Sequence, residues 1–137
     1  MATTTATLSD DQHAFLQQPF VGEVTTLRAD GSPHSTVVWV DVDGDEVVFN
    51  TAIGRAKERH LRRDPRVSLI VVDPEDAYRW LSVTGRAELT TEGADEHIDK
   101  LAKKYLDEDR YPWHNPDQQR IIVRIHPEQI DSYGLDG

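Results

Sequence analysis

Basic residues gather in one short run of the sequence, between Arg55 and Arg66. This run holds six of the fifteen lysine and arginine residues and only two acidic ones. The remainder of the chain has nine basic and 23 acidic residues, a formal balance of -14. A local cluster of positive charge in an acidic protein favours a site for a bound anion. A basic helix face that only contacts solvent would give the same pattern.

The residues around this run predict a loop that turns at Gly54 and one helix that ends at Asp64-Pro65. A helix N-terminus offers unpaired backbone N–H groups and the positive end of the helix dipole to an anion. Arg55 and Lys57 lie at that end, and an arginine can bind two phosphate oxygens at once. We therefore expect a phosphate site for a small anionic cofactor.

Apolar and β-branched residues predict six strands around this helix. The expected strands span residues 20–28, 35–40, 46–49, 67–72, 79–90 and 120–126, and further helices are expected at 9–16 and 91–106. The stretch 35–40 is nearly continuous in such residues, which predicts a strand buried on both faces. Asp30-Gly31 and Asp43-Gly44 predict hairpin turns, and Gly85 predicts a bulge or a close backbone approach.

The order of these elements indicates the fold class. Strands in hairpins with inserted helices predict an antiparallel β-barrel of the α+β class rather than a doubly wound sheet. The length of 137 residues fits one domain. We expect a disordered N-terminal tail at residues 1–8 and a single domain at 9–137.

Composition excludes several classes of function. A net charge of -10 argues against nucleic acid as a partner. The absence of cysteine excludes thiol chemistry, and the six histidines do not have metal-ligand spacing. The N-terminus lacks the features of a signal peptide, and no apolar run is long enough to span a membrane, so we expect a cytoplasmic protein.

Nucleotide-binding and nucleophile motifs are also missing. Neither a Rossmann fingerprint nor a P-loop occurs, and there is no serine nucleophile elbow. We assign no catalytic residue and no metal site. If the protein is an enzyme, a bound cofactor must supply the chemistry.

Three stretches, at residues 33–39, 49–57 and 61–69, resemble the flavin-binding half of the pyridoxamine 5′-phosphate oxidase-like split β-barrel superfamily. The run Arg55-Ala56-Lys57-x-Arg59-x-Leu61-Arg62-Arg63-Asp64-Pro65-Arg66 is most similar to its branch of F420-dependent oxidoreductases, the flavin/deazaflavin oxidoreductases of actinobacteria. The similarity covers residues 9–133. It implies an antiparallel split β-barrel (FMN-binding split barrel) that forms a homodimer, with each cofactor in a groove between the subunits.

The resemblance also implies the cofactor-binding residues. The cofactor phosphate would be held at the helix N-terminus by Thr51, Arg55 and Lys57, with Ala56 between the two cations. The ring system would lie against Thr36, Val37, Val38 and Trp39. The acidic oligoglutamate tail of coenzyme F420 would meet Arg59, Arg62 and Arg63.

The function implied is that of an F420-dependent oxidoreductase, which transfers hydride from reduced F420 to a small apolar organic acceptor. One alternative is an FMN-binding oxidoreductase of the same fold. FMN has no glutamate tail and would leave Arg59, Arg62 and Arg63 without a role. Another is a non-enzymatic flavin- or haem-binding carrier, in which His34 or His60 would have to bind the haem iron.

Two departures from the true oxidases argue against vitamin B6 oxidation. Those oxidases carry Ser-Arg-Lys-Gly where this chain has residues 55–58, and their arginine-bearing C-terminal segment has no counterpart after Asp131. A set of aromatic residues either borders the substrate space or serves core and dimer packing. This set comprises Tyr78, Trp80, Tyr111, Trp113 and Tyr133.

Overall fold

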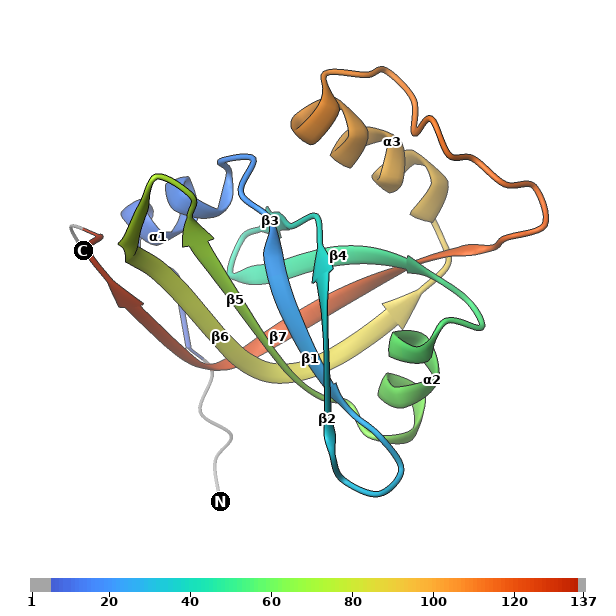
Figure 1. The fold of residues 1–137 in the computed structure, drawn as a ribbon, viewed down its shortest axis with the longest axis horizontal. Helices are drawn as coiled ribbons and strands as arrows, with labels where there is room; N and C mark the ends of the chain where they lie inside the picture. Colours follow the sequence, from blue (N-terminus) through green and yellow to red (C-terminus); the bar gives the residue numbers. More distant parts are fainter. Residues whose placement is uncertain (1–5, 136–137) are drawn as a thin grey trace.

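The computed structural model of the chain describes residues 6–135, which form seven strands and three helices (Figure 1). In chain order these are α1 (Asp10–Leu16), β1 (Gly22–Leu27), β2 (Pro33–Val38), β3 (Asp41–Asp43), β4 (Glu46–Ala52), α2 (Ala56–Arg63), β5 (Arg66–Asp73), β6 (Asp76–Thr90), α3 (Ala94–Leu106) and β7 (Arg120–Tyr133). The three predicted helices and the α+β class are confirmed.

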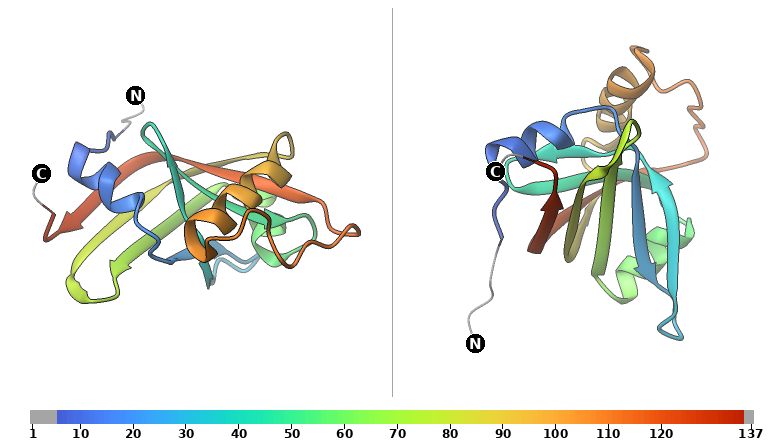
Figure 2. Two further views of the ribbon diagram at one scale, coloured as in Figure 1. Left: turned by 90° about the horizontal axis from the view of Figure 1, so that it is seen from above. Right: turned by 60° about the vertical axis from the view of Figure 1, so that its left-hand side comes forward.

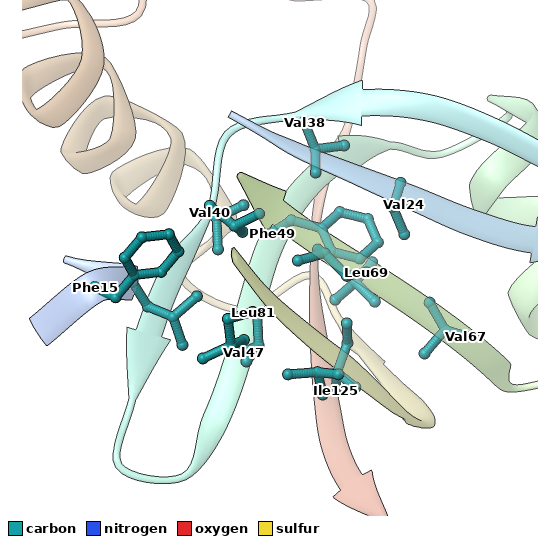
Figure 3. Packing of buried hydrophobic residues seen from close by; sticks show 14 of the residues in the cluster. Phe15, Val24, Val38, Val40, Val47, Phe49, Val67, Leu69, Leu81 and Ile125 are labelled. Atoms are coloured by element: carbon teal, nitrogen blue, oxygen red, sulfur yellow. The ribbon is translucent and has the colours of Figure 1, made fainter. Parts of the chain in front are cut away.

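The strands form one sheet in the order β2-β1-β5-β6-β7-β4-β3, and every neighbouring pair is antiparallel. Buried residues from the whole width of this sheet meet in one hydrophobic cluster, which Figure 3 shows from close by. Val38 of β2 and Phe49 of β4 belong to that cluster, although their strands lie near opposite ends of the strand order. The sheet is therefore curled around a common core, as a split barrel requires.

The helices have different positions around the barrel. α1 begins with a capping box between Ser9 and Gln12 and contributes Phe15 and Leu16 to the core. In the right-hand view of Figure 2, α3 stands above the strands. Its Ala94 packs with Val48 of β4 and Ile122 of β7, so α3 covers the outer face of these two strands.

Of the predicted tail at 1–8, residues 1–5 lie outside the described part of the chain. Ala6 donates its backbone N–H to the carbonyl of Pro127 at 3.1 Å, and Leu8 packs against the core. No helix within residues 6–135 is long and apolar enough to cross a membrane.

The strand predicted at residues 35–40 is not buried on both faces. β2 ends at Val38, pairs only with β1 and lies at the edge of the sheet, and Val37 is 66% exposed. Strand alternation explains the difference, because Thr36 and Val38 face the core whereas Val37 points away from it. Apolar type alone does not show which face of a strand is covered.

The strands also differ from the prediction in extent. The Asp43-Gly44 hairpin is confirmed, but the strand that enters it is the separate short β3, which pairs with β4, and not the strand predicted at 35–40. β7 continues to Tyr133 instead of ending at His126. It passes Pro127 because the β6–β7 register shifts between Thr84 and Gly85, opposite that proline.

Gly85 confirms the predicted close backbone approach. A side chain at this position would overlap the carbonyl oxygen of His126, and its Cβ would lie 3.1 Å from the Cα of Pro127. The overlapping atoms belong to the backbone of β7, which cannot move away without breaking its hydrogen bonds to β6. The glycine therefore permits the long β6–β7 pairing.

We expect Gly85→Ala to lower the free energy of unfolding by about 1–3 kcal/mol, because of this overlap. Urea denaturation followed by fluorescence measures the change. The matched control is Thr84→Ala, an exposed neighbour on the same strand, which should change stability by less than about 1 kcal/mol. Equal stability of Gly85→Ala and the parent protein would contradict the assignment.

Candidate functional site

A cavity of about 200 Å³ lies where the N-terminus of α2, α3 and the 107–119 loop meet the ends of β2, β4 and β7. These elements surround one end of β4 in Figure 1. The cavity wall combines apolar and aromatic side chains with three cations. It consists of Val21, Val37, Val38, Trp39, Asn50, Thr51, Arg55, Lys57, Ile98, Leu101, Tyr111, Trp113 and Arg120.

Trp39, an aromatic residue of this wall, is held by two other aromatic rings. Its ring stacks on Tyr105 of α3 with 5.4 Å between centroids and meets Tyr111 edge to face at 6.0 Å. The next residue, Val40, donates its N–H to the Tyr105 hydroxyl at 2.9 Å and accepts a hydrogen bond from Lys104 at 2.6 Å. α3 thus fixes the segment that connects β2 to β3.

Burial raises the pKa of Tyr105 to about 12 and lowers the pKa of Lys104 to about 8. Strongly shifted groups in a cleft are often functional. Here, however, both side chains bond to backbone carbonyls: Tyr105 to Phe20 and Lys104 to Leu16, each at 2.7 Å. We assign them a structural role at the back of the site.

Three cations, Arg55, Lys57 and Arg120, border the cavity. Among residues 6–135 none of them forms an ion pair with a carboxylate, although most other basic residues of the chain do. Burial lowers the pKa of Lys57, and the charges of Arg55 and Arg120 lower it further. The pKa of Arg120 is lowered mainly by burial. A bound anion would compensate these charges.

The N-terminus of α2 adds further donors. Arg55 occupies the N-cap position, and its side chain makes no capping hydrogen bond, so the first N–H groups of the helix are uncapped. Gly54 has a φ of 95° and forms the turn into the helix. Its own N–H donates to the Glu58 carboxylate at 2.8 Å and is therefore engaged within the chain.

α2 is held in place by contacts of its C-terminal half. Leu61 lies in the core, Nδ1 of His60 lies 2.8 Å from the Thr26 hydroxyl, and Arg63 donates to the carbonyl of Leu27 at 2.8 Å. Burial lowers the pKa of His60, and the nearby His34 lowers it further. A neutral His60 therefore attaches the helix to β1 and fixes the direction in which its N-terminus points.

Two buried donors of the cavity wall have no hydrogen-bond partner among the described residues. They are Oγ1 of Thr51, which is fully buried, and Nη1 of Arg120, a residue that is 6% exposed. Buried polar atoms are nearly always paired. These two atoms are therefore suited to a ligand that presents oxygen atoms, such as a phosphate or the polar edge of a flavin ring.

The cavity brings together six of the residues predicted to bind the cofactor: Val37, Val38, Trp39, Thr51, Arg55 and Lys57. Thr36 and Ala56 lie beside it but do not line it. The three arginines predicted to meet an acidic tail are exposed and also lie off the cavity wall. Arg59 donates to the Gly54 carbonyl at 2.7 Å, Arg62 pairs with Glu58, and Arg63 bonds to β1.

Five residues of the wall were not predicted: Val21, Asn50, Ile98, Leu101 and Arg120. Ile98 and Leu101 were expected only as the sheet-facing side of α3. Asn50 and Arg120 are polar residues within strongly apolar strand patterns, and this contrast was the available signal. Of the five aromatic candidates, Tyr111 and Trp113 line the cavity, whereas Tyr78, Trp80 and Tyr133 lie on β6 and β7, away from it.

Known proteins match the chain over almost its whole length. The sequence profile of the family described as "Pyridoxamine 5'-phosphate oxidase" matches residues 8–134. An F420H(2)-dependent biliverdin reductase from Mycobacterium tuberculosis (strain CDC 1551 / Oshkosh) is 31% identical over 131 residues, which cover 95% of this chain and 91% of that protein. These matches confirm the resemblance drawn from the basic run.

Solved structures give the same result for the fold. A structure described as an F420 reductase superposes with a TM-score of 0.78 at 27% identity and covers 90% of this chain and 98% of its own. General Stress Protein 26 from Bacillus anthracis str. Sterne superposes with a TM-score of 0.70 at 17% identity, over 93% of this chain and 94% of its own. The second similarity concerns the fold alone.

The lowered pKa of Lys57 predicts how anion binding depends on pH. Sulfate binds best to the protonated amine, so its affinity should fall roughly tenfold as the pH rises through this pKa, below the ordinary 10.5. Calorimetric titration with sulfate at increasing pH measures the fall, since sulfate keeps its charge throughout. Lys57→Arg should move the fall to higher pH, and an unchanged profile in that variant would exclude Lys57 as the titrating group.

Proposed function

This chain belongs to the pyridoxamine 5′-phosphate oxidase family, and we propose on that premise that it is an F420-dependent oxidoreductase. It would act as a reductase that transfers hydride from reduced F420 to a small apolar organic acceptor. The observation that carries the proposal is the cavity, where three unpaired cations lie beside an apolar and aromatic wall. The names of the two relatives that use F420 support the choice of cofactor.

The protein's own residues would bind and orient the two reactants. Arg55, Lys57 and the Thr51 hydroxyl are placed to hold the cofactor phosphate at the uncapped N-terminus of α2. Val37 and Trp39 would lie against the ring system. Reduced F420, when bound, supplies a hydride from C5 of its deazaflavin ring. Correct orientation of donor and acceptor can contribute up to about 7–11 kcal/mol of the barrier reduction.

The oligoglutamate tail of F420 would leave the cavity along the exposed side of α2. Arg59, Arg62 and Arg63 lie on that side, and we propose that they contact the tail carboxylates there. Arg59 and Arg63 now donate to the backbone carbonyls of Gly54 and Leu27. A carboxylate accepts a stronger hydrogen bond from arginine than a carbonyl does, so these partners can be exchanged.

An FMN-binding oxidoreductase is the second candidate, and one observation favours it. Arg59, Arg62 and Arg63 already have partners within the chain and do not line the cavity, as expected if the ligand has a phosphate but no acidic tail. The haem-carrier alternative has no such support. No histidine lines the cavity in the part of the chain that the structure describes.

Fluorescence titration with F420 and with FMN should distinguish the two cofactors. We expect the parent protein to bind F420 more tightly, and Lys57→Ala to weaken both ligands about tenfold, since each presents a phosphate. Arg59→Ala should weaken F420 alone. Arg66→Ala is the matched control, because Arg66 belongs to the same basic run but pairs with Asp64 at 2.7 Å. Equal losses for both ligands in Arg59→Ala would contradict the contact with the tail.

We further propose that the complete site lies between two copies of the chain. The cavity of about 200 Å³ is smaller than the roughly 300–1,000 Å³ of typical ligand sites, so one chain encloses only part of a cofactor. Apolar side chains are also exposed around it, with Val21 at 51%, Val37 at 66% and Trp113 at 62%. Exposed apolar groups gathered at one place often mark an interface.

A homodimer should have twice the 15.6 kDa of the chain when measured by light scattering after gel filtration. We expect Val21→Asp to weaken the dimer, because it would bury a carboxylate in the contact. Val72→Asp is the control, since Val72 is also exposed, at 38%, but lies away from the cavity. A monomeric parent protein that still binds its cofactor tightly would exclude the shared site.

A further inference from the structure

Arg120 is the buried cation that the proposed phosphate site does not use. It begins β7, where its Cα pairs with that of Ala52 in β4, and the residue is only 6% exposed. Arginine is almost never fully buried unless its charge is paired. No ion pair compensates it among residues 6–135, so its presence beneath α3 requires an explanation.

The contacts of Arg120 hold its guanidinium in one orientation. Nε donates to Oδ1 of Asn50 at 2.9 Å, and the guanidinium carbon lies 5.2 Å from the centre of the Tyr111 ring. Asn50 is itself fixed, because its Nδ2 donates to the carbonyl of Ala94 at 3.0 Å and lies 3.1 Å from Nδ1 of His97. One edge and one face of the guanidinium are therefore occupied by the protein.

The opposite end of the guanidinium is left without a partner. Nη1 is buried and makes no hydrogen bond to any described residue, and Arg120 lines the cavity. Thr51 also lines the cavity, and its buried hydroxyl likewise has no hydrogen-bond partner among the described residues. Leaving a buried charged donor unpaired costs more free energy than leaving a neutral one. The protein accepts this cost beside a cavity, where bound molecules can satisfy the two donors: the cofactor phosphate for Thr51 and a second group for Arg120.

We propose that Arg120, oriented by Asn50 and Tyr111, is a second anion-binding position of the cavity and takes a carboxylate attached to the otherwise apolar, flat hydride acceptor. A carboxylate matches the planar end of a guanidinium, and the aromatic wall suits a flat group attached to it. Arg120 contacts β4 and the 107–119 loop, whereas Arg55 is the N-cap residue of α2 and Lys57 lies in its first turn. The inference rests on the proposed function only for the identity of the reaction.

The pKa of Arg120 supports this assignment. Burial lowers it, and the charge of Arg55 lowers it further. Two groups act in the opposite direction, Tyr111 and the carboxylate of Asp95. Neither provides an ion pair to the guanidinium. Binding of a carboxylate would therefore be favoured, because it would compensate the positive charge of Arg120.

Benzoate, a flat carboxylate, and sulfate are suitable probes because neither requires the cofactor. Both should bind to the parent protein in calorimetric titrations and raise its melting temperature. Arg120→Gln should weaken benzoate about tenfold or more and leave sulfate within about twofold. Lys57→Ala should do the reverse. The matched control is Arg124→Gln, on the same strand, whose charge pairs with Asp43 at 2.9 Å and Glu46 at 3.3 Å.

Several results would overturn the proposal. One is that benzoate fails to bind to the parent protein, and another is that Arg120→Gln weakens sulfate as much as benzoate. The latter would make Arg120 part of the phosphate site. If Arg120→Gln does not fold, Arg120→Lys replaces it. This variant keeps the charge but loses the planar end, and benzoate affinity should fall several-fold while sulfate affinity is unchanged.

Titration of the same variants with F420 and FMN identifies which molecule presents the oxygen. Unchanged cofactor affinity in Arg120→Gln would support the acceptor, whereas a tenfold loss would assign the position to the polar edge of the cofactor ring and overturn the acceptor assignment. If neither cofactor binds to the parent protein, the proposed function fails. The benzoate result stands independently, because it is measured without any cofactor.

Discussion

The site depends on three positive charges that the protein keeps close together, and no carboxylate within residues 6–135 forms an ion pair with them. Mutual repulsion and burial both oppose this arrangement, and the lowered pKa of Lys57 and of Arg120 shows their combined effect. The antiparallel register of β4 and β7 enforces it. That register places Arg120 opposite Ala52, three residues before Arg55 and five before Lys57. A bound ligand with anionic oxygens would remove the repulsion.

The remainder of the fold makes this register rigid. α3 covers the outer face of β4 and β7, and its backbone carbonyl at Ala94 fixes Asn50, which in turn fixes Arg120. The same helix uses Tyr105 to hold Val40, and with it the stacked Trp39. One helix therefore positions both the buried cation and the aromatic wall. A change in the position of α3 would therefore disturb both Arg120 and the aromatic wall of the cavity.

Local patterns were sufficient for the three helices, for six of the seven described strands and for the two cavity cations of the basic run. The Gly54 turn, the basic helix and the hairpin glycines follow from residue type and spacing, and Arg55 and Lys57 follow from their place at a helix N-terminus. Arg120 could not be found in this way. It lies 65 positions after Arg55, and only the pairing of β7 with β4 brings them together. Which side chains of β2 point away from the core depended on strand alternation, which their shared apolar type obscured.

The structure also changes the meaning of the basic run itself. Its six cations favoured a bound anion, but Glu58 pairs with Arg62 and Asp64 pairs with Arg66, so these two positive charges are compensated within the chain. Two of the six reach the cavity. The site is therefore small, and its third cation, Arg120, comes from β7. Only the folded protein brings these charges together, so an anion that binds them stabilises the native state by linkage. In the empty site, the repulsion between the charges is not compensated.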